Sequence, residues 1–356
     1  MILIDVIATI RRDQEKKNDT EAHLQRIKYL MLELNIMIFR INVGKWNEEE
    51  FNTLIEDVKM IRKVAEENNK RAKIILDLPF PGRKARVVTY TKKLGFNIKK
   101  NKTVEIYSAT EYELGRLFDG QLLKEKDKMI FGVSIPNIGN MVKVGDDILY
   151  ADGEGLFTVR TIEDENKITA IAQNNFKLDN AKSIHFKNSV HVANLDDTVI
   201  ELIQSIEPDA VALSFVEDVS PVIKMKEIMK KLNLKCSIMA KIESKKGVEN
   251  IDNILDMVDS IMIGRGDLGL HVDVVDFPKI VFDLIKKTKI RNKYICVATG
   301  FMDTYVEQCI PSRADITDLF VMVNTETDGV VFTYKTVREN EVMKKIVHMI
   351  NVWKDC

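Results

Sequence analysis

The sequence predicts an α/β fold, a (β/α)8 TIM barrel with a small β domain inserted after the third strand. Three observations support this fold. Short β-branched runs alternate with amphipathic helical stretches over most of the 356 residues, as in parallel sheets built from βα units. The alternation stops between about Val87 and Asn188. Three predicted strands before this interruption and five after it give the eight strands that a closed barrel requires.

The residues before the interruption predict the first three strands and two helices. A strand over Ile2–Thr9 precedes a helix over about Glu21–Leu34, in which apolar side chains recur every three or four residues. A strand over Ile36–Ile41 is followed by a helix of the same periodicity that includes Phe51, and Lys73–Leu78 is the third strand. These segments form the first part of the predicted barrel.

The interrupted region carries β-type runs separated by Gly, Asn and Asp, which favour turns. It shows no clear amphipathic βα repeat. We therefore predict a separate β-rich domain over residues 87–188, with the barrel formed by residues 1–86 and 189–356. The predicted strands of this domain include Val104–Tyr107, Met129–Ser134, Ile148–Ala151, Leu156–Arg160 and Ile168–Ala172.

The βα alternation then resumes and completes the barrel. The predicted strands are Ala210–Phe215, Ser237–Ile242, Ser260–Gly264, Tyr294–Ala298 and Gly329–Tyr334. The predicted helices are Pro221–Leu232, Gly247–Met257, Phe277–Thr288, Arg313–Val323 and about Glu339–Val352. An open doubly wound sheet with one miscounted strand is the alternative, and the count of eight strands favours the barrel.

Composition and charge argue against several classes of protein. A hydrophobic fraction of 45% with 30% charged residues is typical of a soluble globular chain. The formal net charge of −1 argues against binding nucleic acid or a membrane surface through bulk charge. No apolar run approaches the roughly 18 residues of a membrane span, and the start of the chain does not resemble a signal peptide. With four scattered cysteines, these features predict a cytoplasmic protein.

Ionisable side chains gather at the predicted C-terminal ends of the strands, where TIM barrels carry their active sites. Each has a structural alternative: Lys241 and Glu243 could form a strand-end ion pair, and Arg265–Gly269 a glycine-assisted turn. Together they are costly to bury unless a metal or substrate neutralises them. Carboxylates beside cations suit a hard divalent metal and an anionic, above all phosphorylated, substrate. The other strand-end residues are Arg40, Asn42, Asp77, Asp267 and Thr299.

Several of these segments resemble the pyruvate kinase family. Met239–Asn250 followed by Ile261–Leu270 is similar to the metal- and substrate-binding segment of that family. The resemblance covers nearly the whole chain, and we expect the family's C-terminal regulatory domain to be absent. The neighbouring segments that fit the family are Ala212–Val216, Ile295–Thr299 and Pro311–Asp315.

The resemblance implies a metal site and a phosphoryl site. Glu243 and Asp267 are expected to hold the Mg²⁺ or Mn²⁺ that bridges the enolpyruvate oxygens and the phosphoryl group. Lys241 and Arg40 are expected to neutralise the phosphoryl group of phosphoenolpyruvate, whose negative charge is spread over several oxygens during transfer.

The resemblance also implies how the rest of the substrate is held. The backbone N–H groups of Gly266 and Asp267 would bind the substrate carboxylate, because glycine lets the backbone approach closely. Thr299 would orient or relay the proton that converts enolpyruvate to pyruvate. The inserted domain would act as a lid that excludes water.

The family's monovalent-cation site is altered in this sequence. Gly44 and Leu78 stand where the family has two hydroxyl side chains. The segment Pro79–Arg86 is about two residues longer than its family counterpart, and its Lys84 would place an ammonium group near the altered site. We therefore expect that K⁺ is not required. The two cation ligands that remain are Asn42 and Asp77.

The resemblance implies that the contacts with phosphoenolpyruvate and the metal are kept, whereas most contacts with ADP are changed. The leading hypothesis is a pyruvate kinase-like phosphotransferase that acts on phosphoenolpyruvate or pyruvate with ADP or a related acceptor. The second is a Mg²⁺-dependent enzyme that binds phosphoenolpyruvate or a 2-oxo acid but uses a different acceptor. The third is a non-catalytic homologue. The family also suggests a homo-oligomer. The changed nucleotide segments are Thr9–Asp13, Gly44–Trp46, Gly300 and Thr333–Thr336.

Overall fold

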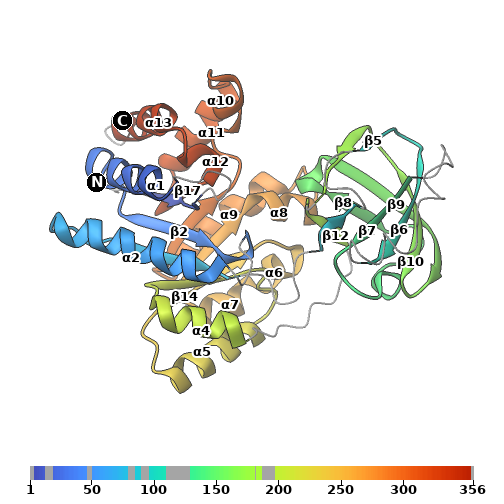
Figure 1. The fold of residues 1–356 in the computed structure, drawn as a ribbon, viewed down its shortest axis with the longest axis horizontal. Coiled ribbons are helices and arrows are strands. Elements are labelled where there is room, and N and C mark those ends of the chain that lie inside the picture. Colours follow the sequence, from blue (N-terminus) through green and yellow to red (C-terminus); the bar gives the residue numbers. More distant parts are fainter. Residues whose placement is uncertain are drawn as a thin grey trace. The chain divides into compact units, whose positions relative to one another are not determined.

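The chain forms two compact units in the computed structural model (Figure 1). One unit comprises Met1–Phe80 and Leu195–Cys356, and the other comprises Pro81–Asn194. The structure describes residues 4–12, 19–45, 50–78, 85–89, 96–109, 129–180, 182–186 and 197–353.

The first unit is a closed barrel of eight parallel strands. This confirms the predicted fold and excludes the open sheet, because the last strand pairs with the first. Around the barrel the strands are β1 (Asp5–Thr9), β2 (Ile38–Asn42), β3 (Lys73–Asp77), β13 (Ala210–Leu213), β14 (Ser237–Ile242), β15 (Ser260–Gly264), β16 (Tyr294–Ala298) and β17 (Gly329–Phe332).

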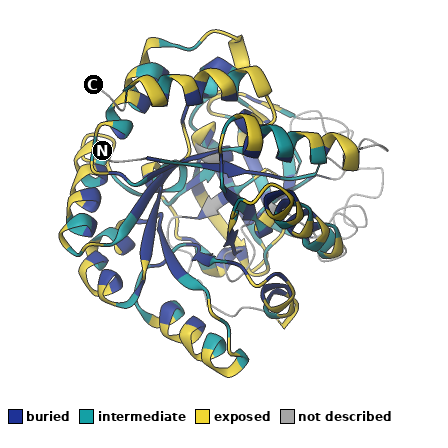
Figure 2. Cartoon of the chain, turned by 90° about the vertical axis from the view of Figure 1, so that its left-hand side faces the viewer, coloured by how far each residue is buried: buried dark blue, intermediate teal, exposed yellow. Residues whose placement is uncertain are grey.

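Helices surround these strands, and Figure 2 shows buried strands at the centre with helices whose outward faces are exposed. The first helix ends in a π-helical turn over Tyr29–Glu33. The helices are α1 (Asp19–Lys28), α2 (Phe51–Glu67), α4 (Asp197–Ile206), α5 (Ser220–Leu232), α6 (Lys245–Glu249), α7 (Ile251–Met257), α8 (Arg265–His271), α9 (Phe277–Ile290), α10 (Asp303–Gln308), α11 (Arg313–Val323), α12 (Tyr334–Val337) and α13 (Asn340–Trp353).

One predicted helix differs in the structure, and one segment with an open structural alternative is helical. The predicted helix Gly247–Met257 is wrong as a single element, because the chain breaks at Asn250 between α6 and α7. The Asn250 side chain donates a hydrogen bond to the Glu217 carbonyl, 2.8 Å away, and this contact with the loop between β13 and α5 holds the break in place. The Arg265–Gly269 segment, for which a turn was the structural alternative, forms the first part of α8.

The barrel strands are buried on both faces. Their outward side chains pack against the helices, and their inward side chains fill the barrel. Fully burying an aliphatic side chain contributes about 1.5–3 kcal/mol. This two-sided burial explains the continuous apolar runs of the sequence and leaves polar side chains mainly at the strand ends. The inward-facing cluster consists of Ile7, Ile38, Ile75, Ala210, Ala212, Met239, Met262, Cys296, Ala298 and Val331.

The second unit is β-rich, as predicted for the insertion. Its main sheet has the order β12-β8-β9-β10-β6-β7-β4, and β11 pairs with β5. Its core contains the stacked pair Tyr150 and Phe176 and the edge-on pair Phe157 and Phe176. The strands are β4 (Val87–Val88), β5 (Phe96–Ile98), β6 (Thr103–Ser108), β7 (Met129–Val133), β8 (Asp147–Tyr150), β9 (Gly155–Asp164), β10 (Lys167–Ala172), β11 (Phe176–Leu178) and β12 (Ile184–Phe186).

Among the described helices, none combines the length and the apolar character that a membrane-spanning segment needs.

Candidate active site

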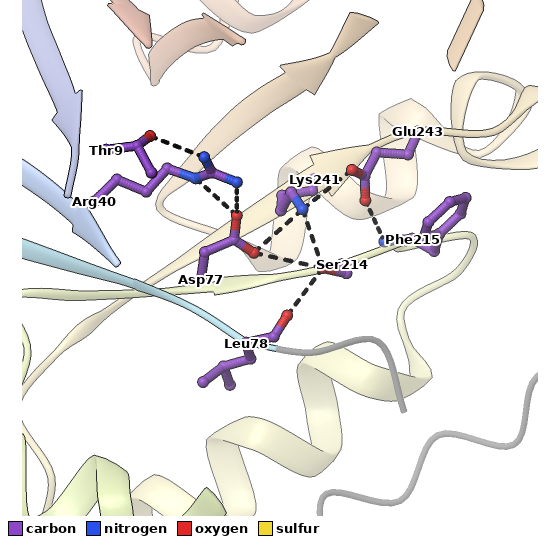
Figure 3. A network of polar contacts seen from close by, with 8 residues as sticks. All are labelled: Thr9, Arg40, Asp77, Leu78, Ser214, Phe215, Lys241 and Glu243. Atoms are coloured by element: carbon purple, nitrogen blue, oxygen red, sulfur yellow. Dashed lines mark hydrogen bonds and ion pairs between the residues drawn. The ribbon is translucent and has the colours of Figure 1, made fainter. Parts of the chain in front are cut away.

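Four predicted site residues meet at the C-terminal ends of β2, β3 and β14 (Figure 3). Asp77, at the end of β3, is 1% exposed and lies between two cations. Arg40 Nε donates to Asp77 Oδ2 at 2.8 Å, and Lys241 Nζ lies 3.2 Å from Asp77 Oδ1. Arg40 also donates to the Thr9 hydroxyl at 3.0 Å. Each Asp77 oxygen therefore faces a different cation.

Lys241 connects this carboxylate to Glu243. Its Nζ lies 3.1 Å from Glu243 Oε1 and donates to the Ser214 hydroxyl, also at 3.1 Å. The second Glu243 oxygen, Oε2, accepts the backbone N–H of Phe215 at 2.9 Å. Ser214 in turn donates to the Leu78 carbonyl. The loop after β13 thus holds both ends of the Lys241–Glu243 pair.

The charges of this network reinforce one another. Burial alone would raise the pKa of Asp77, but the nearby charges of Lys241 and Arg40 outweigh burial and lower it. Burial alone would lower the pKa of Lys241, but Asp77 and Glu243 outweigh burial and raise it. Both shifts favour the charged forms, Asp77 as a carboxylate and Lys241 as an ammonium.

Asp267 adds a third carboxylate charge to this site. Its charge acts on Lys241, as do the charges of Asp77 and Glu243. Carboxylates that gather in a buried site favour binding of a cation.

The donor set of Glu243 and Asp267 fits a hard divalent cation. Carboxylate oxygens accept more than one bond, so the contacts of Glu243 with Lys241 and Phe215 are compatible with metal ligation. Among the described residues, no group of three or more His, Cys, Asp or Glu side chains could hold a metal. A metal held by these two carboxylates would complete its coordination with water and substrate oxygens, which is common for Mg²⁺.

Glycines at the start of α8 leave space for the neighbouring site residues. A Cβ atom on Gly264 would lie 2.8 Å from Glu243 Oε1, closer than real Cβ atoms approach. A Cβ atom on Gly266 would lie 3.1 Å from Thr299 Cγ2. The structure therefore places Glu243 against the end of β15, and Thr299, which is exposed at the end of β16, against α8.

The remaining predicted site residues lie outside the network. Asn42 ends β2 and pairs in register with Asp77. Arg86 belongs to the second unit, where its backbone bridges to Ser183. Lys84 lies outside the described residues.

Sequence reasoning assigned no role to Ser214, Phe215 or Thr9. Ser214 and Phe215 follow β13 directly and lie in the segment Ala212–Val216 that resembles the family, and these were the signals that could have pointed to them. The roles of Ser214 and Phe215 depend on the register of β13 and β14. This register places the Ser214 hydroxyl beside Lys241 and the Phe215 backbone N–H beside Glu243.

The family model and the relatives that match this chain all point to the same family. Residues 5–341 match the family model described as pyruvate kinase, barrel domain. The pyruvate kinase of Thermococcus litoralis is 30% identical over 98% of this chain and 70% of the relative. That of Thermotoga maritima is 27% identical over 91% of the chain and 66% of the relative. That of Mycoplasma pneumoniae is 28% identical over 90% of the chain and 61% of the relative. The chain thus spans about two thirds of the length of these relatives.

The free energy of unfolding of a Gly264 variant tests whether Glu243 needs the space that this glycine leaves. We expect Gly264→Ala to lower the free energy of unfolding by about 1–3 kcal/mol, because Lys241 and the Phe215 N–H hold the buried Glu243 in place. Gly269→Ala is the matched control, because its Cβ would lie 3.6 Å from the Phe277 ring, an ordinary contact. It should be neutral or stabilising by up to about 1 kcal/mol. Denaturant unfolding measures both, and equal stabilities would contradict the assigned contact.

Proposed function

The chain belongs to the pyruvate kinase family, and we propose that it transfers a phosphoryl group from phosphoenolpyruvate to ADP or a related acceptor with a divalent metal. The observation that carries this proposal is the buried network of Arg40, Asp77, Lys241 and Glu243 at the C-terminal ends of the barrel strands. This is the end of a TIM barrel where catalysis takes place. We also propose a cytoplasmic location and assembly into a homo-oligomer.

In this proposal the two cations act on the phosphoryl group. Its transfer spreads negative charge over several oxygens, and pre-positioned positive charges stabilise that state. The contacts with Asp77 support this role, because they fix both Arg40 and Lys241 before substrate arrives. Fixed charges need little reorganisation during the reaction.

Glu243 and Asp267 would hold Mg²⁺ or Mn²⁺ in this proposal. When bound, the metal would supply positive charge that stabilises the negative charge on the enolate and phosphoryl oxygens. The position of Glu243 beside Lys241, on which the charge of Asp267 also acts, supports this assignment. Lys241, paired with Glu243, keeps a positive charge next to the metal ligand.

The carboxylate end of the substrate would lie against α8. Backbone N–H groups of Gly266 and Asp267 would bind it, since the first turn of a helix presents N–H groups without helical partners. Thr299, whose side chain lies against Gly266, would orient or relay the proton to the enolpyruvate carbon.

A different phosphoryl acceptor is the second candidate, and two contacts favour it. Arg12, in the changed segment after β1, donates to the Asp57 carboxylate at 2.9 Å and is turned toward the protein. Thr333, in the changed segment after β17, caps α12 by accepting from the Thr336 N–H. Both side chains thus have structural partners in place of a nucleotide.

Two activities measured on the full chain test these proposals. Phosphoenolpyruvate consumption with Mg²⁺ is followed with and without ADP, and exchange of the pyruvate methyl protons is followed in D₂O. Consumption that depends on ADP would support the leading proposal. Exchange without such turnover would support the second candidate, and the absence of both would contradict an enzymatic function.

Replacing Glu243 should weaken metal binding. We expect Glu243→Gln to lower the affinity for Mn²⁺, measured with oxalate present as an enolpyruvate mimic, by more than the roughly tenfold that loss of an outer-shell partner costs. Glu249→Gln is the control, because Glu249 makes an exposed ion pair with Lys245. Unchanged Mn²⁺ affinity in Glu243→Gln, with the fold intact by circular dichroism, would contradict the metal assignment.

Phosphoryl transfer should not require K⁺. Gly44 offers no side-chain oxygen, the Leu78 carbonyl accepts from Ser214, and both Asp77 oxygens face a cation. A further monovalent cation would therefore be repelled at this position. Rates in K⁺ and in tetramethylammonium at matched ionic strength should agree within about twofold. Strong activation by K⁺ would show that the site binds a monovalent cation after all.

A further inference from the structure

Thr299 has an unusual backbone conformation for its residue type. Its φ of 76° lies in the left-handed region, which a β-branched residue rarely adopts. Such conformations persist only where surrounding contacts hold them, and they are frequent in active sites. The contacts that hold Thr299 are therefore of functional interest.

Arg265, the first residue of α8, makes the contacts to the Thr299 backbone. Its Nε and Nη2 donate to the Thr299 carbonyl at 3.0 and 2.7 Å. The guanidinium is itself fixed from two further sides. Nη1 and Nη2 donate to the two carboxylate oxygens of Asp318 at 2.7 and 2.8 Å, and the group lies 4.0 Å above the Phe301 ring.

These contacts use the planar shape of the guanidinium. One edge binds a carboxylate, the adjacent edge binds a carbonyl, and the face lies on an aromatic ring. A lysine ammonium cannot reproduce this arrangement. If Arg265 served only to join α8 to α11, the bonds to Asp318 would suffice and two bonds to Thr299 would be unnecessary.

We propose that Arg265 is a positioning residue that holds Thr299 in its left-handed conformation and so keeps its side chain against Gly266. Gly266 lies next to Arg265 in α8, so one short helix sets both the backbone and the side chain of Thr299. The role of Thr299 in proton transfer rests on the proposed function. The positioning of Thr299 by Arg265 does not depend on it.

A double-mutant cycle separates positioning from an independent role. Arg265→Lys should lower the rate of pyruvate methyl-proton exchange by about 10²-fold, a typical cost of a misplaced group. In a Thr299→Ala background, the same change should lower the residual rate by less than about twofold, because the hydroxyl side chain that Arg265 positions through the backbone is gone. An equal loss in both backgrounds would overturn the proposal. Mn²⁺–oxalate affinity should stay unchanged in Arg265→Lys.

Backbone hydrogen exchange tests the positioning without relying on activity. Peptides covering residues 299–302 should exchange at least about tenfold faster in Arg265→Lys and in Asp318→Asn, which weakens the attachment of Arg265. Arg291→Lys is the matched control, because Arg291 pairs with Asp252 and Asp256 elsewhere on the barrel. It should leave these peptides unchanged.

The two experiments fail in distinguishable ways. Unchanged protection of residues 299–302 in both folded variants, with folding checked by their unfolding midpoints, would overturn the positioning role whatever the activity. Absence of pyruvate exchange in the unaltered protein would contradict the proposed function, while hydrogen exchange would still decide the role of Arg265.

Discussion

Two cations, Arg40 and Lys241, are held together at the end of the barrel because the carboxylate of Asp77 lies between them. Without it, each cation would repel the other in a site from which water is largely excluded. Burial of an unpaired ion costs roughly several kcal/mol, even after the surrounding protein relaxes. Asp77 is 1% exposed and directs one oxygen to each cation, so it offsets both costs at once. The remaining polar contacts extend from this arrangement.

The barrel supplies the positions from which this carboxylate acts. Asp77 ends β3, Arg40 lies near the end of β2, and Lys241 lies near the end of β14. Parallel strands direct these ends to one side, where the barrel interior stops being apolar. The site also requires the Glu243 side chain to approach the backbone at the end of β15 closely. Gly264 allows this, because it has no side chain and leaves room for the Glu243 carboxylate. The site therefore combines charges fixed by the strands with space left by glycine.

The sequence predicted the barrel well because its strands are buried on both faces and read as apolar runs. It also predicted Arg40, Asp77, Lys241 and Glu243 as neighbours, since polar residues that end successive strands must share one rim. It could not predict the break at Asn250, which depends on a contact with Glu217. Nor could it predict that Arg265 holds the Thr299 backbone, because hydrogen bonds of this kind follow from tertiary packing.

The pH dependence of stability in Asp77→Asn tests most directly whether this carboxylate holds the network together. The pKa of Asp77 is lowered in the folded state, so its contribution should be present above the ordinary carboxyl pKa of about 3.9 and lost as pH falls through the lower folded value. At pH 7 the variant should be less stable by about 3–5 kcal/mol, and the difference should shrink toward pH 3. Asp252→Asn, which disrupts an exposed pair with Lys287, should cost at most about 1 kcal/mol. A difference for Asp77→Asn that is equally small, or that does not change between pH 7 and pH 3, would contradict the account.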